Sequence, residues 1–134
     1  MVKIIVQKIV FSNIKASKLY DMYLDSKQHS AITGEPATIK AKEGSKYSGY
    51  DGYHYGKILQ LIKDKLIVQS FTAIDWNKKD VDSTLILLFE QDGKDAIIYM
   101  THANVPDIQE SAINTGWKEF YWNPWKMYLK TLKK

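Results

Sequence analysis

The chain ends on GWKEFYWNPWKMYLKTLKK, residues 116–134, and this stretch decides the fold. Its nineteen residues include three tryptophans, two tyrosines and a phenylalanine. At 100° per residue the apolar side chains cover an arc of about 220°, whereas an ordinary surface helix carries a stripe of about 100°. Such a helix must be wrapped rather than covered on one side, and a strongly curved sheet can wrap it. The residues in the arc are Trp117, Phe120, Tyr121, Trp122, Trp125, Met127, Tyr128, Leu129 and Leu132.

A proline interrupts this helix near its middle. Pro124 has no backbone N–H, so it removes the hydrogen bond to the carbonyl group of Phe120. We expect the helix to bend there, which is tolerable if it lies across a concave sheet. The aromatic side chains are interpreted first as the core between helix and sheet. The alternative is that some of them line a ligand cavity.

The preceding part of the chain predicts a strand, two short helices and a series of strands. The helices are expected from Ser17 to Leu24 and from Ser26 to Ile32, and the strands at 2–11, 37–41, 46–48, 54–62, 66–74, 83–91 and 96–105. Strands that follow one another through tight turns form an antiparallel sheet. The predicted class is α+β, a helix-grip fold: a curved antiparallel sheet of about six or seven strands around a long C-terminal helix, with two short helices after strand 1.

Length and composition exclude several classes of protein. The 134 residues predict a single domain spanning residues 1–134. Cysteine is absent, which excludes disulfides, thiolate catalysis and cysteine-ligated metal. All nineteen basic residues are lysine, and the lack of arginine counts against specific nucleic-acid binding. No apolar run is long enough to span a membrane and no signal peptide is recognised, so we expect a cytoplasmic protein.

Several stretches resemble the heat-shock-protein-90 ATPase activator-like family. GWKEFYWNPWKMYL at 116–129, preceded by HANVPD at 102–107, is similar to the end of that family. IVQSFTAIDW at 67–76 resembles one of its strands with the tryptophan-containing loop that follows. STLILLFEQDGKDAIIYMTH at 83–102 resembles its last hairpin, and YSGYDGYHYGKIL at 47–59 its glycine-rich middle hairpin. The similarity covers about residues 7–132.

The resemblance implies a fold and a cavity. The family belongs to the helix-grip superfamily, which also contains START-type lipid carriers and Bet v 1-type allergens. It implies a cavity between the curved sheet and the C-terminal helix. The eukaryotic chaperone activators carry a further N-terminal domain that does much of the chaperone binding. This chain is expected to start at the helix-grip domain, so the resemblance leaves a chaperone partner in doubt.

Strand alternation and the resemblance together predict which side chains point toward the helix. Ile98, Met100 and His102 share a face on one strand, as do Ile67, Gln69 and Phe71 on another. His102 would then lie in an apolar interior and need a polar partner. It is interpreted first as a satisfied core histidine, with a ligand anchor and a general base as the alternatives.

The other two histidines lie in different surroundings. His54 belongs to GYDGYHYG at 49–56, whose glycines indicate bulges and a turn, or else a cavity mouth lined by tyrosines. His29 lies in the early helical segment and is expected to be exposed. The three histidines lack the spacing of a metal site, so neither a metal nor another cofactor is predicted.

The opposite face of the sheet also looks apolar. Ile86, Leu88, Ile97 and Tyr99 are expected to project outward. A continuous patch there would indicate a partner or a second copy of the chain, and a monomer and a homodimer both stay open.

We predict a binding protein whose internal cavity takes a small hydrophobic or amphipathic ligand. A protein-interaction or co-chaperone module is the first alternative. A cyclase- or hydrolase-like enzyme that uses His102 is the second, and no catalytic residue is assigned. The predicted ligand-binding residues are His54, Gln69, Phe71, Trp76, Met100, His102, Trp117 and Tyr121.

Overall fold

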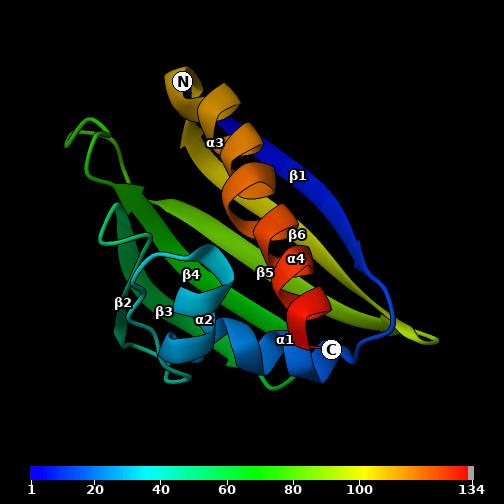
Figure 1. Ribbon diagram of the computed structural model, residues 1–134. Helices are drawn as coiled ribbons and strands as arrows, with labels where there is room; N and C mark the ends of the chain where they lie inside the picture. Colours follow the sequence, from blue (N-terminus) through cyan, green and yellow to red (C-terminus); the bar gives the residue numbers. More distant parts are fainter. Residues whose placement is uncertain (133–134) are drawn as a thin grey trace.

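Strands and helices follow the predicted order in the computed structural model, which describes residues 1–132 (Figure 1). The strands of that part are β1 (Val2–Phe11), β2 (Lys46–Gly49), β3 (His54–Ile62), β4 (Leu66–Ala73), β5 (Ser83–Asp92) and β6 (Asp95–Pro106). The helices are α1 (Ala16–Tyr23), α2 (Ser26–Thr33), the 3-10 turn η1 (Asp107–Gln109), α3 (Glu110–Gly116), the π-helical η2 (Trp117–Trp122) and α4 (Asn123–Leu132).

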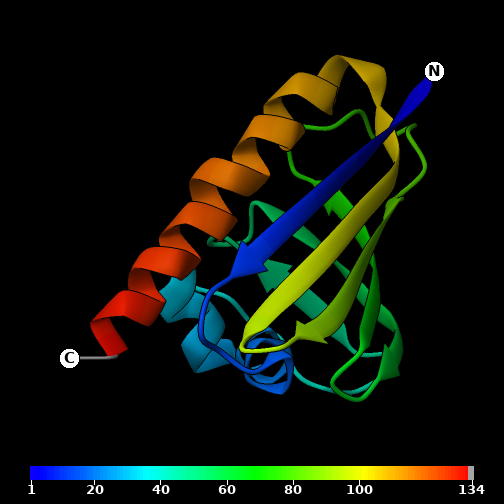
Figure 2. The same cartoon turned by 90° about the vertical axis from the view of Figure 1, so that its right-hand side faces the viewer.

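The strands form an antiparallel sheet in the order β1-β6-β5-β4-β3-β2. The sheet is curved, and the continuous helix formed by α3, η2 and α4 lies along its concave side (Figure 2). The short helices α1 and α2 close one end of the layer between helix and sheet (Figure 1). The predicted α+β class and helix-grip architecture are therefore confirmed.

One predicted strand is wrong. Residues 37–41 form no strand, and only an isolated bridge joins Thr38 to Ser48. The backbone groups of this segment bond to serine side chains of α2 instead. Ser30 Oγ lies 2.8 Å from the amide nitrogen of Ala37, and Ser26 Oγ lies 2.8 Å from the amide nitrogen and the carbonyl oxygen of Ile39. These bonds satisfy the backbone without a neighbouring strand.

The terminal helix buries a narrower face than the sequence predicts. Trp117, Tyr121, Trp122, Trp125 and Leu129 are buried as expected. The other members of the arc reach solvent. Tyr128 is half-buried, whereas the exposed fractions of Phe120, Leu132 and Met127 are 48%, 50% and 61%. The sheet covers the helix on one side only. The prediction that the whole apolar arc of about 220° is buried is therefore wrong.

The helix changes from α-helical to π-helical in the turn before Pro124. Trp117–Trp122 is π-helical, and the N–H of Asn123 donates to the carbonyl of Lys118, five residues back. Residues 110–132 run as one continuous helix in Figure 2, without the sharp bend expected at the proline. A π turn is one way in which a helix absorbs an irregularity in its hydrogen-bond ladder.

A buried glutamine joins this helix to the edge strand β1. The indole N–H of Trp122 donates to Oε1 of Gln7 over 2.7 Å. Nε2 of Gln7 in turn donates to the backbone carbonyl and to Oδ1 of Asn114. This polar contact fixes the helix against β1 within an otherwise apolar core.

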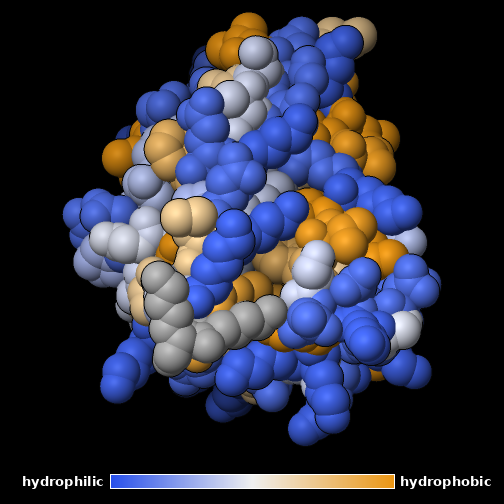
Figure 3. Space-filling model, turned by 45° about the vertical axis from the view of Figure 1, so that its right-hand side comes forward, coloured by the Kyte–Doolittle hydropathy of each residue, from blue (hydrophilic) through white to orange (hydrophobic). Residues whose placement is uncertain are grey.

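The outer face of the sheet is only partly apolar. Leu88 is 43% exposed, Ile86 and Tyr99 are half-buried, and the Lys8 amine lies 5.9 Å from the ring centre of Tyr99. Ile97 is buried, contrary to expectation, between its strand neighbours Val10 and Glu90. Figure 3 shows a different side of the molecule, that of the terminal helix, where hydrophilic side chains predominate and apolar residues lie in separate patches. Whether the protein is a monomer or a homodimer stays open, and gel filtration is the test.

Candidate functional site

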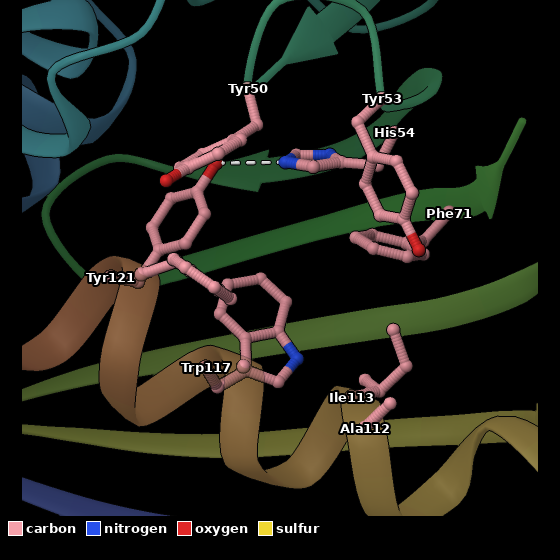
Figure 4. A pocket seen from close by; sticks show the side chains of 10 residues that line it. Tyr50, Tyr53, His54, Phe71, Ala112, Ile113, Trp117 and Tyr121 are labelled. Carbon is pink, nitrogen blue, oxygen red and sulfur yellow. Dashed lines mark hydrogen bonds between the residues drawn. The ribbon is translucent and has the colours of Figure 1, made fainter.

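A pocket of about 340 Å³ lies between the first half of the terminal helix and the turn that joins β2 to β3 (Figure 4). Its wall is almost entirely apolar and rich in aromatic rings. The helix contributes one side and the β2–β3 turn with β4 the other. The lining residues are Tyr50, Tyr53, His54, Phe71, Ala112, Ile113, Gly116, Trp117, Phe120 and Tyr121.

The β2–β3 turn places Tyr50 and Tyr53 at the pocket through an unusual backbone. Tyr50 and Asp51 have positive φ angles of 50° and 58°, and Gly52 follows with 83°. Side-chain-bearing residues adopt this left-handed region rarely, and bulky ones least of all. The Tyr50 ring then meets Phe120 edge to face, and the Tyr53 hydroxyl donates to Asp75 over 2.9 Å. The turn is thus held against both the helix and the loop after β4.

Gly49 makes room for His54. The two residues are paired across β2 and β3. A Cβ atom on Gly49 would lie 2.5 Å from Cε1 and 2.6 Å from Nε2 of His54, closer than real Cβ contacts. The imidazole also stacks on Phe71 at 4.8 Å and 15°. Glycine is therefore required for this ring to lie in the pocket wall.

Tyr121 joins two buried histidines. Its hydroxyl oxygen lies 2.8 Å from Nε2 of His29 and 2.9 Å from Nε2 of His54. Nδ1 of His29 lies 2.7 Å from the backbone carbonyl oxygen of Tyr23. The prediction that His29 is exposed is wrong: it is 2% exposed, because α2 packs its buried face against the terminal helix. Sequence patterning gave no signal for this contact between distant segments.

Burial keeps these groups uncharged near neutral pH. Burial, and then the neighbouring His29 and His102, lower the pKa of His54 to about 3. Burial also lowers the pKa of His29, against the opposing effect of its bond to the Tyr23 carbonyl. Burial, and then nearby tyrosines, raise the pKa of Tyr121 well above its usual value. The pocket wall is therefore neutral and suits an uncharged ligand surface.

His102 is a satisfied core residue. The indole N–H of Trp117 donates to its Nδ1 over 3.1 Å, and its Nε2 lies 2.8 Å from Oγ of Ser83. The Ser83 hydroxyl donates to the carbonyl of Phe71, so Nε2 of His102 carries the proton. Burial lowers the pKa of His102 to about 3. With both nitrogens bonded and no place in the pocket wall, His102 is not positioned as a base toward a molecule bound there.

The eight predicted binding residues fall into two groups. His54, Phe71, Trp117 and Tyr121 line the pocket. The remaining four are buried outside its wall: Gln69 accepts from the Tyr23 hydroxyl, Trp76 packs near Phe71, and Met100 and His102 lie on β6. The role of all eight in binding stays a prediction.

Sequence reasoning did not assign the helix residues Ala112, Ile113, Gly116 and Phe120 to a site, although they form one side of this pocket. For Tyr50 and Tyr53, the sequence offers a position at a cavity mouth only as the alternative to bulges and a turn. The signal available for them was their position in the GYDGYHYG turn.

Two other features, a metal site and a membrane-spanning helix, are absent from the described part of the chain. Within residues 1–132, no three histidine, cysteine, aspartate or glutamate side chains gather into a group that would hold a metal ion. No helix in the same range has the length and apolar character needed to cross a membrane.

Comparison with known proteins yields one consistent family. A family model described as Activator of Hsp90 ATPase homolog 1-like protein matches residues 13–130. The human activator of 90 kDa heat shock protein ATPase homolog 1 is 26% identical over 104 residues, which are 78% of this chain and 30% of the human protein. The chain thus corresponds to about a third of that relative's length.

Solved structures agree on the fold. An HSP90 activator from Plasmodium falciparum matches with a TM-score of 0.81 and 22% identity, over 94% of this chain and 96% of the other. The Aha1 dimer from Colwellia psychrerythraea matches with a TM-score of 0.73 and 16% identity, over 98% and 93%. At such identities the likeness shows a shared fold.

Proposed function

The chain belongs to the family of activator of Hsp90 ATPase homolog 1-like proteins, and we propose that it is a binding protein that takes a small apolar or amphipathic molecule into the pocket beside its terminal helix. The observation that supports this most is the pocket itself. Its volume of about 340 Å³ lies within the range of about 300–1,000 Å³ usual for small-molecule sites. A cytoplasmic location stays part of the proposal.

The wall of the pocket has the composition such a role needs. Aromatic rings from the helix, the β2–β3 turn and β4 supply apolar surface, and only a few polar atoms lie among them. Rings held by neighbouring rings lose little freedom when a ligand enters. Trp117 contacts Phe71, Tyr121 and Trp122, and His54 contacts Phe71 and Tyr121. The wall is thereby pre-organised for a flat apolar molecule.

Native mass spectrometry of the unmodified chain and of two variants tests this function. Native mass spectrometry of the purified protein is expected to show a copurifying small molecule or, after removal, a one-to-one adduct with 2-naphthol or 2-methylnaphthalene. Ala112→Trp should abolish that adduct, because Ala112 lines the pocket from an exposed helix position. Ser111→Trp is the matched control, exposed on the same helix but outside the wall. No adduct with the unmodified chain, or equal binding by the two variants, would refute the function.

A co-chaperone module is the second candidate, supported by the family match and by the relatives named as activators of the chaperone's ATPase. Exposed apolar side chains on loops and at the start of the helix offer contact surface, namely Ile74, Val81 and Ile108. The test is a pull-down with the cell's own 90 kDa chaperone followed by an ATPase assay. An unchanged ATPase rate at saturating protein would eliminate this candidate.

A further inference from the structure

One polar atom in the pocket wall has no hydrogen-bond partner. Nδ1 of His54 is buried, and no group within residues 1–132 bonds to it. The side chain as a whole is 4% exposed, so bulk water does not serve it either. Figure 4 shows the imidazole between Tyr50 and Tyr53, with one nitrogen bonded to the Tyr121 oxygen and the other without a bond. Whether this nitrogen donates or accepts decides what a ligand must offer it.

The answer starts at His29, on the other side of Tyr121. Its Nδ1 lies 2.7 Å from the carbonyl oxygen of Tyr23, which can only accept, so Nδ1 carries a proton. Because burial lowers the pKa of His29, the ring is neutral and its Nε2 holds a lone pair. The Tyr121 hydroxyl therefore donates its proton to Nε2 of His29 over 2.8 Å.

The same reasoning passes through Tyr121 to His54. A phenol has a single proton, and that of Tyr121 is already used. Its oxygen must accept from Nε2–H of His54 over 2.9 Å. His54 is neutral as well, so it has only this proton and its Nδ1 is a bare acceptor. The carbonyl of Tyr23 thus fixes, through two histidines and a tyrosine, the tautomer that faces the pocket.

We propose that the pocket selects small apolar ring compounds that carry a hydroxyl group, which donates a hydrogen bond to Nδ1 of His54. The inference rests on the binding function proposed above and names its ligand class. A ligand carbonyl or carboxylate would set its own lone pairs against that of Nδ1 and leave both acceptors unpaired. Because Nδ1 is buried, the contact with the hydroxyl requires the tyrosine rings that flank the imidazole to move aside as the ligand enters.

The size of the pocket supports the same class. About 340 Å³ lies at the small end of ligand sites, which favours one or two fused rings over a long acyl chain. The surrounding rings of Phe71, Trp117 and Phe120 offer faces and edges on which a flat molecule packs. A fatty acid fails on both grounds, by its length and by its carboxylate.

Binding of matched naphthalene compounds tests the inference. Isothermal titration with 2-naphthol, 2-methylnaphthalene and 2-naphthaldehyde compares a hydroxyl, a methyl group and a carbonyl on one ring system. We expect 2-naphthol to bind about 5- to 150-fold more tightly than the other two, the ratio for satisfying a buried polar group. Equal affinities, or tighter binding of the aldehyde, would overturn the inference but leave the binding function intact. If none of the three binds, the binding function fails and the inference falls with it.

Tyr121→Phe provides the sharpest variant. It keeps the ring and removes only the hydroxyl, which frees His54 to place its proton on either nitrogen. The preference for naphthol over naphthaldehyde should then largely disappear, because the ring can accept from the hydroxyl or donate to the carbonyl. A preference that survives in this variant contradicts the relay.

A measurement on the unmodified protein needs neither ligand nor variant. Side-chain ¹⁵N NMR of the histidines at pH 7 distinguishes a protonated from an unprotonated ring nitrogen. We expect His54 to carry its proton on Nε2 and His29 on Nδ1. A proton on Nδ1 of His54 would overturn the inference directly.

Discussion

Acidification should destabilise this protein well before its carboxylates are protonated. The three histidines are buried, and burial lowers the pKa of each in the folded state, to about 3 for His54 and His102. In the unfolded chain a histidine titrates near 6.5. Below that pH the unfolded chain binds more protons than the folded one, so the free energy of unfolding falls as the pH falls. The loss continues until the pH reaches the folded-state pKa.

The size of the effect follows from these values. Between pH 7 and pH 5, a group shifted from 6.5 to about 3 loses about 2 kcal/mol, since each pH unit below the unfolded pKa removes about 1.4 kcal/mol. His54 and His102 together lose about 4 kcal/mol, and His29 adds to the loss in the same direction. A domain has about 5–15 kcal/mol of stability in all.

Urea unfolding followed by tryptophan fluorescence at pH 7, 6 and 5 measures this loss. The range stays above the usual pKa of carboxyl groups, so histidines dominate it. His102→Gln is the matched variant: it should reduce the pH-dependent loss by about 2 kcal/mol whatever its effect at pH 7. An unfolding free energy that stays constant from pH 7 to pH 5, or a variant with the full pH dependence, would refute the assigned burial of these rings.

Three further substitutions test the packing of the fold and site. Gln7→Ala leaves the buried indole N–H of Trp122 without its acceptor and should lower the unfolding free energy by about 1–3 kcal/mol in urea titrations. Trp125→Ala removes a fully buried ring and should lower it by about 3–5 kcal/mol, whereas a loss below about 1 kcal/mol would contradict its core position. Gly49→Ala forces the His54 ring to move and should lower the unfolding free energy by about 1–3 kcal/mol. It should also change the histidine ¹⁵N spectrum, and an unaltered spectrum would contradict the contact.

The sequence predicts the fold because its strongest patterns are local. Alternating apolar residues in β4, β5 and β6 and the tight turns between strands specify an antiparallel sheet. Trp117, Tyr121 and Trp125 recur at helical spacing and are all buried. The same reasoning wrongly predicts a strand at 37–41, because the serine side chains of α2 form hydrogen bonds with the backbone of this segment. No local pattern reveals a bond to a side chain on another element.

The candidate site was harder to predict for the same reason. Strand alternation places His102 and Gln69 correctly in the interior, but it does not tell a satisfied core residue from one beside a cavity. That difference depends on Ser83 and Trp117, which meet His102 only in the folded chain. His29 shows the limit most clearly, because its burial depends on Tyr121, 92 residues away.

The π turn connects the fold of the terminal helix to the chemistry of its pocket. In an α-helix, side chains five residues apart point about 140° away from each other. Trp117 and Trp122 nevertheless stack at 5.4 Å and 17°, because bonds from residue i to i+5 bring such positions toward one face. Trp122 can then reach Gln7 on β1 while Tyr121, its neighbour, reaches His29 and His54. The wider turn, which directly precedes Pro124, lets one helix hold the sheet and complete the pocket wall with adjacent residues.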